Sequence, residues 1–237
     1  MYQLSDVVIL VPTYNERDNI GLTLDRVAKV SQELRVIVID DSSPDGTAEI
    51  VRHMVRMYPS MELLLRTEDK GFAKAYLAGF RKALEDESAK VVLMMDADFS
   101  HDPEEIPGML ARLNERADVV TGSRYAVRQE FKDITLWRRV LSRFANVYVK
   151  MVLGLPLTDC TSGFVMMRRE VLQKLPMTDV RTEGYGFLFQ LKYRAWKQGF
   201  KIVEHPVRWP ERHQGKSKMT VKRMFESARL PWLIRFG

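Results

Sequence analysis

The sequence is poor in cysteine and has no long apolar run. Cys160 is the only cysteine among its 237 residues, which excludes an internal disulfide and any metal site built from several cysteines. No run of about 18 apolar residues occurs that would predict a transmembrane helix. The first residues also lack the basic region and small-residue cleavage site of a signal peptide. We therefore expect a chain that starts at Met1 and stays in the cytoplasm, with Cys160 as a packing residue rather than a catalytic thiol.

Charge is divided unevenly along the chain, whose net charge is +6. Residues 1–123 hold 14 Lys and Arg against 22 Asp and Glu, a net charge of −8, whereas residues 124–237 hold 23 against 9, a net charge of +14. The basic half predicts an anionic partner: nucleic acid, a phosphorylated small molecule or the anionic face of a membrane. Charge alone does not choose among the three.

Short apolar runs alternate with helical patterns in the first half. These runs are continuous and rich in branched residues, which is typical of buried parallel strands. They cover residues 7–11, 36–40, 61–65, 91–95 and 118–120. The segments between them carry apolar residues at helical spacing. The sequence therefore predicts an α/β fold: a Rossmann-like, mostly parallel sheet with helices on both faces.

Polar and acidic residues follow three of the predicted strands, in segments 12–16, 40–46 and 96–100. Ligands of open α/β sheets bind outside the carboxyl ends of the strands, so these segments are the candidate site. Asp96 and Asp98 point the same way from an extended backbone, and they suit a divalent cation, since Mg²⁺ takes one or two carboxylates plus substrate phosphates. The alternatives are a solvated loop after the strand and, in segment 40–46, a turn in which Asp45 caps the next helix.

The order of the motifs resembles a family 2 glycosyltransferase, and more narrowly the dolichyl- and polyprenyl-phosphate mannosyltransferases. The similarity runs from Val7 to about Lys218. It is carried by VPTYNERDNI, VIVIDDSSPDGT, KGFAKAYLAGF, MDADFSHDPEEIP, TGSRY, DCTSGF and ERHQGKSK, in this order along the chain. The pairing of the last two motifs is the part most specific to polyprenyl-phosphate acceptors.

The resemblance implies one catalytic domain of the GT-A fold over residues 1–237. Residues 1–123 would form the nucleotide-binding half, 124–218 the acceptor-binding half and 219–237 a C-terminal amphipathic or apolar helix. The implied reaction transfers mannose from GDP-mannose to a dolichyl or polyprenyl phosphate with inversion, using Mg²⁺ or Mn²⁺. Two alternatives stay open: another sugar, such as glucose from UDP-glucose, and a nucleic-acid-binding domain. The second fits poorly because the basic half carries no recognised nucleic-acid-binding motif.

The resemblance also assigns roles to individual residues. The nucleotide pocket would be lined by Pro12, Tyr14, Glu16, Ile39 and Asp41. The pyrophosphate would meet Asp96, Ala97 and Asp98 through the metal. Ser100 stands where the family usually has a glutamine ligand, so a hydroxyl or a bridging water would replace that ligand.

The anion contacts implied by the resemblance are Arg124, Arg212 and Lys218, because basic side chains, and arginine forks above all, suit phosphate oxygens. Asp159 would lie near the acceptor and orient basic groups. The implied catalytic residues are thus Asp98, Arg124, Asp159 and Arg212. A phosphate acceptor is already anionic at neutral pH, its second pKa being about 6, so no general base is expected. The metal would stabilise the departing nucleoside diphosphate while basic residues hold the attacking phosphate.

Two C-terminal segments predict contact with a membrane surface. On a helix over residues 136–153, a wide apolar arc containing Trp137 and Tyr148 lies beside a basic stripe, a pattern that suits a lipid interface; the alternative is an arc that packs on the sheet. Residues 224–237 crowd Trp and Leu around Pro231, as a peripheral anchor, an oligomer contact or the start of a membrane-spanning region. We expect peripheral association with the cytoplasmic face of a membrane and no nucleic-acid partner.

Overall fold

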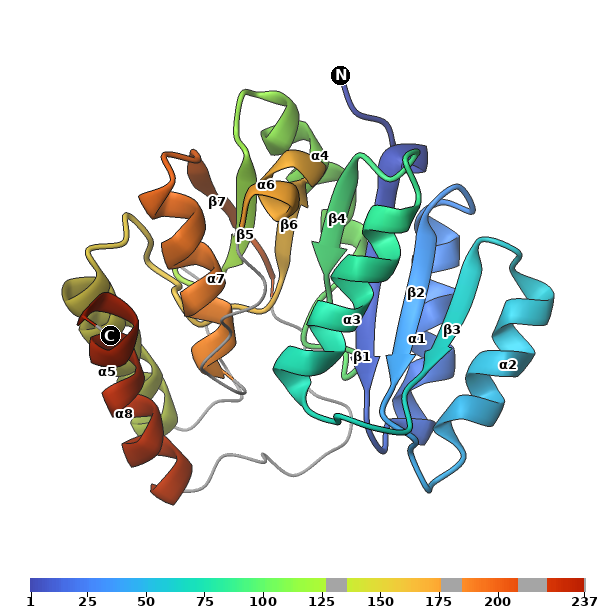
Figure 1. Cartoon of the computed structure of the whole chain (residues 1–237), viewed down its shortest axis with the longest axis horizontal. Helices are drawn as coiled ribbons and strands as arrows, with labels where there is room; N and C mark the ends of the chain where they lie inside the picture. Colours follow the sequence, from blue (N-terminus) through green and yellow to red (C-terminus); the bar gives the residue numbers. More distant parts are fainter. Residues whose placement is uncertain (127–135, 176–184, 209–220, 237) are drawn as a thin grey trace.

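A seven-stranded sheet forms the centre of the computed structural model, which describes residues 1–126, 136–175, 185–208 and 221–236 (Figure 1). The strand order is β3-β2-β1-β4-β6-β5-β7. The strands are β1 (Val7–Thr13), β2 (Arg35–Asp40), β3 (Met61–Leu65), β4 (Val91–Met94), β5 (Val119–Ser123), β6 (Val165–Arg168) and β7 (Ile202–Pro206). Neighbouring strands are parallel except where β6 meets β4 and β5. The predicted α/β fold with a mostly parallel sheet is confirmed.

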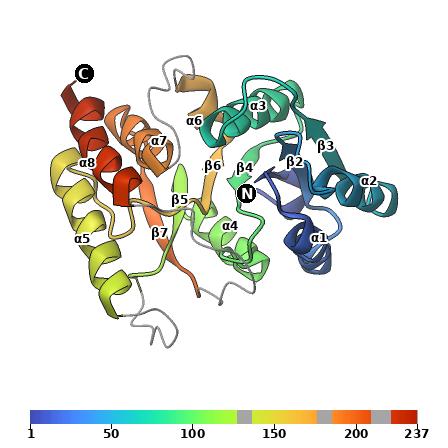
Figure 2. The same cartoon turned by 90° about the horizontal axis from the view of Figure 1, so that it is seen from below.

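Helices cover both faces of this sheet (Figure 2). They are α1 (Arg17–Val30), α2 (Thr47–Met57), α3 (Phe72–Glu85), α4 (Ile106–Asn114), α5 (Leu136–Leu153), α6 (Arg169–Lys174), α7 (Tyr185–Lys197) and α8 (Val221–Phe236), with short 3-10 turns at Leu4–Asp6 and Pro103–Glu105. Successive strand residues face opposite sides, so Ile9 belongs to the core cluster that includes residues of α1, α2 and α4, whereas Leu10 belongs to the cluster that includes residues of α3 and α7. The continuous apolar strands follow from this burial on both faces.

The chain reverses direction across the sheet between β1 and β4. From β1 it winds outward through β2 and β3, then returns to place β4 on the other side of β1. Such a reversal opens a crevice at the carboxyl ends of the two strands. In Figure 1 β1 runs from the top to the lower edge of the sheet, so that lower edge is where a ligand site is expected.

The chain beyond residue 123 contributes β6 and β7, which the sequence patterns did not reveal. β6 has only four residues, and β7 is half-exposed over most of its length. Because β6 is inserted between β4 and β5, one continuous sheet joins the two halves of the chain. No helix in the described ranges is long and apolar enough to cross a bilayer.

Helix α3 lies close against the sheet at Gly79. A Cβ atom at this position would be 2.9 Å from Ile39 Cδ1 and 3.1 Å from Leu10 Cδ1, which is closer than side chains tolerate. Glycine therefore permits this approach, and it brings Tyr76, one turn earlier on α3, fully into the core. Tyr76 reaches the end of β4 from there.

Candidate active site

Left-handed backbone follows three strands at the edge where the site is expected. Asn15, Ser42 and Phe99 have φ angles of 59°, 53° and 64°, values that are uncommon for residues other than glycine and unusual for a buried aromatic such as Phe99. One of these residues follows each of β1, β2 and β4. Backbone in sparsely populated regions clusters at functional sites, where the surrounding structure holds it in place.

The segments after β1 and β2 are joined by buried Asp40. Its Oδ2 accepts hydrogen bonds from Thr13 Oγ1 at 2.8 Å and from Ser43 Oγ at 2.6 Å, and its Oδ1 accepts from Ser43 N at 2.9 Å. Asp45 adds a second link, since its carboxylate accepts from Thr47 N at 3.0 Å and Arg17 N at 3.1 Å. Gly46, not Asp45, is the N-cap of α2; Asp45 instead accepts from the first N–H group of α2 and of α1, so both aspartates have structural roles.

Asp41 is the acid in this region that faces a basic partner. It is 7% exposed; its Oδ1 accepts from Arg66 NH1 at 2.5 Å, and its Oδ2 accepts from Gly71 N at 2.7 Å. A carboxylate offers about four lone-pair sites, so these two bonds leave acceptor capacity for a base N–H. Sequence reasoning missed Arg66; the signal was its place directly after β3, at the same sheet edge.

The other residues predicted for the nucleotide pocket divide into exposed and buried members. The side chain of Tyr14 is 49% exposed, whereas Pro12 and Glu16 are half-buried. Ile39 lies under Gly79 of α3, and buried Ala97 accepts a hydrogen bond from Thr23 Oγ1 through its carbonyl oxygen at 2.9 Å. Nucleotide contacts by Ile39 and Ala97 stay a prediction, and they would be made by backbone atoms.

Asp96 and Asp98 follow β4, and their neighbours hold both carboxylates in place. Asp98 Oδ1 accepts from Ser100 N at 3.1 Å and from Ser100 Oγ at 2.5 Å. The Tyr76 hydroxyl lies 3.5 Å from Asp96 Oδ1. Burial, together with the Asp96 charge, raises the pKa of Tyr76 well above its ordinary value, so this phenol keeps its proton and donates it toward Asp96.

His101 fixes the backbone of the same segment. Its Nδ1 accepts a hydrogen bond from Asp96 N at 2.9 Å, and its ring stacks on Phe164 with centroids 4.9 Å apart. The side chain is 1% exposed, with Nε2 3.9 Å from Asp96 Oδ2. His101 is therefore a packing and orienting residue.

The two aspartates fit a hard divalent cation. The side chain of Asp96 is 33% exposed, so its oxygens are accessible from the crevice. Within the described part of the chain, no cluster of three or more His, Cys, Asp or Glu side chains forms a metal cage. Mg²⁺ typically binds through one or two carboxylates and completes its shell with water and substrate phosphates. The donor set at the end of β4 matches that mode, with Ser100 turned toward Asp98 as a hydrogen-bond donor.

An ion pair between Arg124 and Asp159 lies beside β5. Arg124 Nε donates to Asp159 Oδ2 at 2.7 Å and its NH2 donates to Oδ1 at 3.0 Å, a bidentate geometry. Asp159 is fully buried, whereas the Arg124 side chain is 20% exposed. Burial alone would raise the pKa of Asp159, but the Arg124 guanidinium and the Lys192 charge outweigh it and lower this pKa.

The segment that carries Asp159 passes directly beside Asp96. A Cβ atom on Gly163 would lie 3.6 Å from Asp96 Oδ2 and 3.4 Å from His101 Cε1. The predicted metal ligands and the predicted acceptor segment, more than 60 residues apart in the sequence, are therefore neighbours. The predicted phosphate contacts Arg212 and Lys218 lie outside the described residues.

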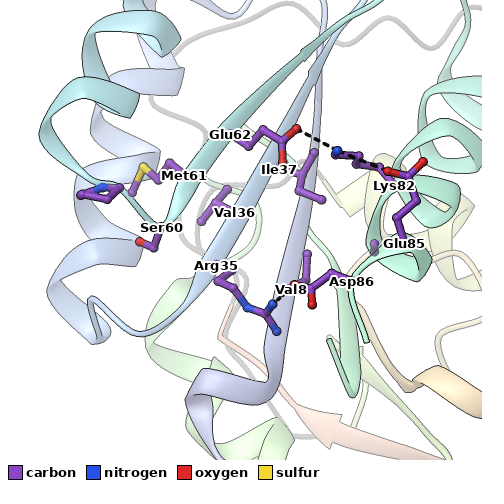
Figure 3. Close-up of a pocket in the computed structure, with 12 residues that line it drawn as sticks. Val8, Arg35, Val36, Ile37, Ser60, Met61, Glu62, Lys82, Glu85 and Asp86 are labelled. Carbon is purple, nitrogen blue, oxygen red and sulfur yellow. Dashed lines mark hydrogen bonds and ion pairs between the residues drawn. The ribbon is translucent and has the colours of Figure 1, made fainter. Parts of the chain in front are cut away.

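A separate cavity of about 370 Å³ lies at the opposite end of the sheet (Figure 3). Its lining includes Val8, Arg35 and Met61, which stand at the amino ends of β1, β2 and β3. Lys82 reaches across it to Glu62, with Nζ 3.4 Å from Oε1. None of the residues predicted for the site lines this cavity. We therefore do not assign the cavity to the candidate active site.

The paired aspartates lie at the carboxyl end of β4, and the Arg124–Asp159 pair belongs to the segment beside them. This arrangement agrees with the glycosyltransferase class that the sequence motifs predict. The comparisons with known proteins agree with this class. The chain belongs to glycosyl transferase family 2, whose sequence pattern matches residues 8–176.

Individual curated proteins within this family are also similar to the chain. The chain is 38% identical over 214 residues to the polyprenol monophosphomannose synthase of Mycolicibacterium smegmatis, covering 90% of this chain and 80% of that protein. It is 37% identical over 214 residues to the undecaprenyl-phosphate mannosyltransferase of Micrococcus luteus, covering 90% and 87% respectively.

Solved structures support the fold. A glucosyl-3-phosphoglycerate synthase from Mycobacterium tuberculosis, in complex with Mg²⁺ and UDP, superposes with a TM-score of 0.69 at 16% identity, over 97% of this chain and 77% of that one. A mannosyltransferase from Pyrobaculum calidifontis, in complex with GDP-mannose and Mn²⁺, gives a TM-score of 0.60 at 21% identity, over 90% and 58% respectively. At these identities the likeness concerns the fold.

Proposed function

We propose that the chain transfers mannose from GDP-mannose to the phosphate of a polyprenyl phosphate, with inversion at the anomeric carbon. The observation that carries this proposal is the contact between the two halves, where Gly163 places the Asp159 segment against Asp96. The names of the curated relatives supply the sugar and the acceptor class. A donor diphosphate at Asp96 and an acceptor phosphate at Arg124 would then lie side by side.

On the donor side, Asp96 and Asp98 would hold Mg²⁺ or Mn²⁺ against the diphosphate. The metal would neutralise the charge that develops on the departing GDP. Ser100 keeps Asp98 in one orientation, while Tyr76 and His101 do the same for Asp96. Asp41 would accept a hydrogen bond from a base N–H of the nucleotide.

On the acceptor side, Arg124 would hold the attacking phosphate. A phosphate oxygen forms a bond to the anomeric carbon as the bond from that carbon to the GDP oxygen breaks, and GDP leaves with the electron pair. The acceptor is anionic before it attacks, since the second pKa of a phosphate monoester is about 6; no proton has to be removed. Asp159 is already committed to Arg124 and its pKa is lowered, so it orients the arginine instead of serving as a base.

The acceptor of this reaction is a lipid, and α5 and α8 offer a surface for it. Large apolar side chains on α5 are exposed at one-turn spacing: Val140 54%, Phe144 68%, Val147 46% and Met151 67%. On α8 Trp232, Leu233 and Phe236 are at least half exposed. Val152, at the edge of the predicted apolar arc, packs into the core, together with Val149 and Leu153, which lie outside that arc.

The exposed apolar residues of α5 and α8 lie on one helix pair. Trp232 Nε1 donates a hydrogen bond to Tyr148 Oη at 2.8 Å, and Tyr148 Oη donates to the Ala228 carbonyl at 2.7 Å. Exposed Arg143 and Lys150 stand among the apolar side chains. An apolar surface with basic residues and an interfacial Trp suits the headgroup region of an anionic bilayer. The proposed location is thus peripheral, with this helix pair against the membrane.

A transfer assay tests the proposed reaction. Radiolabelled GDP-mannose and a polyprenyl phosphate are incubated in detergent with Mg²⁺, with Mn²⁺ and with chelator, and label is counted in the lipid phase. We expect metal-dependent lipid label that Asp98→Ala reduces at least ~100-fold, as loss of a key electrostatic group does. Glu104→Ala, which removes an exposed carboxylate nearby, should leave the rate unchanged. Transfer from UDP-glucose but not from GDP-mannose would overturn the donor assignment.

A further inference from the structure

Lys192 on α7 is a buried cation inside the acceptor half. It is 1% exposed, and its Nζ donates to the Ser162 carbonyl at 2.7 Å and to the Cys160 carbonyl at 3.0 Å, with Thr121 Oγ1 at 3.4 Å. Removing an ammonium group from water is costly unless hydrogen bonds and opposite charges compensate. Methionine or leucine would suit this position better if packing were its only role. The buried charge of Lys192 therefore indicates a further role.

Charges of both signs surround this ammonium group. Asp159 and Glu204 act on it as anions, while Arg124 acts as a like charge and the Cys160 thiol also lies nearby. Burial lowers the pKa of Lys192 from 10.5 to about 8, against the pull of Asp159. Burial also raises the pKa of the Cys160 thiol to about 11, so that group stays neutral when Lys192 titrates. Two cations and two anions thus form one balanced cluster.

Both N–H groups and carbonyl groups of the segment 158–162 are hydrogen-bonded to side chains from other parts of the chain. Glu204 Oε1 accepts from Thr158 N and Asp159 N at 2.9 Å each, and Asn146 Oδ1 accepts from Thr161 N at 3.2 Å. Lys192 binds the carbonyl side of the same segment at residues 160 and 162. Residue 159 lies between these attachments, so its orientation depends on all of them.

We propose that Lys192 is a positioning residue for the acceptor phosphate: its ammonium group fixes the segment 159–162 and thereby holds Asp159 where it aims Arg124 at the acceptor. The chain of contacts runs from Lys192 to the carbonyls of 160 and 162, to the Asp159 carboxylate, and by the bidentate ion pair to Arg124. The kinetic consequence rests on the proposed transfer to a phosphate acceptor, whereas the structural consequence does not.

The first test measures amide hydrogen exchange in the full chain without substrate. Lys192→Met keeps the length of the side chain but removes its charge and its donors. We expect exchange in the peptide that covers residues 158–163 to rise about tenfold, since hydrogen bonds from charged groups are stronger than average. Exchange at β1 and β4 should stay unchanged. Lys197→Met, the same substitution at an exposed position on α7, is the matched control. Unchanged exchange in 158–163, or an equal rise throughout the sheet, would overturn the proposal.

The second test separates acceptor binding from donor binding. We expect Lys192→Met to raise KM for the polyprenyl phosphate about tenfold without changing KM for the sugar nucleotide, and Lys192→Arg to recover part of the loss. In the wild type the acceptor KM should rise above pH 8, while the variant stays flat there. An equal rise of both KM values contradicts a positioning role. If the wild type transfers nothing to polyprenyl phosphate, the proposed function fails, and the exchange experiment still decides the role of Lys192.

Discussion

The nucleotide half and the acceptor half present charge in different ways. In residues 1–123 three acids near the strand ends are held by short polar turns, Asp40 by Ser43, Asp45 by Thr47 and Asp98 by Ser100, and Asp41 is the exception because it pairs with Arg66. In the acceptor half the central charges are buried and satisfied across the fold, as Asp159 is by Arg124 and Lys192 is by carbonyls 30 residues away. Local turns thus hold most acids at the proposed donor end, whereas a long-range ion cluster holds the charges at the proposed acceptor end.

The largest difference between the halves is expected at Asp159. Asp159→Ala leaves Arg124 without its bidentate partner in a largely buried position, so the free energy of unfolding should fall by about 3 kcal/mol. Glu49→Ala breaks the exposed pair with Arg52 on α2, and the free energy of unfolding should change by no more than about 0.5 kcal/mol. Urea denaturation of both variants makes the comparison. Equal effects would show that the Arg124–Asp159 pair is no more structural than a surface pair.

A pH dependence should follow from Lys192. Its pKa is about 8 in the folded chain and 10.5 without burial, so between these values the unfolded chain binds more protons and stability rises with pH. The unfolding free energy of the wild type minus that of Lys192→Met should therefore increase from pH 8 to 10.5, by roughly 3 kcal/mol at most. Lys197→Met serves as the control. A difference that is constant with pH would contradict burial of a titrating ammonium group.

In the nucleotide half, Arg66→Ala should affect the donor alone. Losing Arg66 removes the hydrogen bond that orients Asp41, so the Kd for GDP measured by calorimetry should rise about tenfold. The acceptor KM should not change, which is the reverse of the expectation for Lys192→Met. Weaker acceptor binding in the Arg66 variant would mean that the two halves are not separate in function.

The smallest effect is expected at the lipid surface. Met151→Ser removes an exposed apolar side chain of α5, and Met57→Ser makes the same change at an exposed position on α2, in the nucleotide half. Partitioning onto anionic vesicles, measured by sedimentation, should fall about threefold for the first variant, because only part of the side-chain area leaves water. The second should partition like the wild type. Equal losses would remove the argument for a membrane face at α5 and α8.

The contrast between the halves also explains what the sequence could predict. Strand runs in the first half are continuous because helices bury both faces, and the ends of β1, β2 and β4 meet at a switch point that follows from topology. The helix over residues 136–153 was predicted with its bounds, and its apolar arc was visible. That Val152 of this arc packs inward was not predicted, since burial on α5 depends on the elements that pack against it, such as α8.

The missed residues share a different cause. Arg66, Lys192 and Glu204 lie 25, 30 and 45 residues from their partners Asp41, Ser162 and Asp159. A single charged residue in a sequence does not indicate which distant residue it will bind. The β6 strand was missed because it runs directly into α6, with no turn residue between the strand and the helix. Asp96 and Asp98 were predicted because two aspartates, two residues apart directly after an apolar strand, are recognisable in the sequence alone.

The central claim is that donor and acceptor phosphates meet at one point, between Asp96 and the Asp159 segment. The most direct measurement is GDP release from GDP-mannose, followed with and without polyprenyl phosphate and with and without divalent metal. The expected result is release only when both are present, and loss of release in Asp98→Ala. Release that proceeds at the same rate without polyprenyl phosphate, or in the presence of chelator, would contradict it.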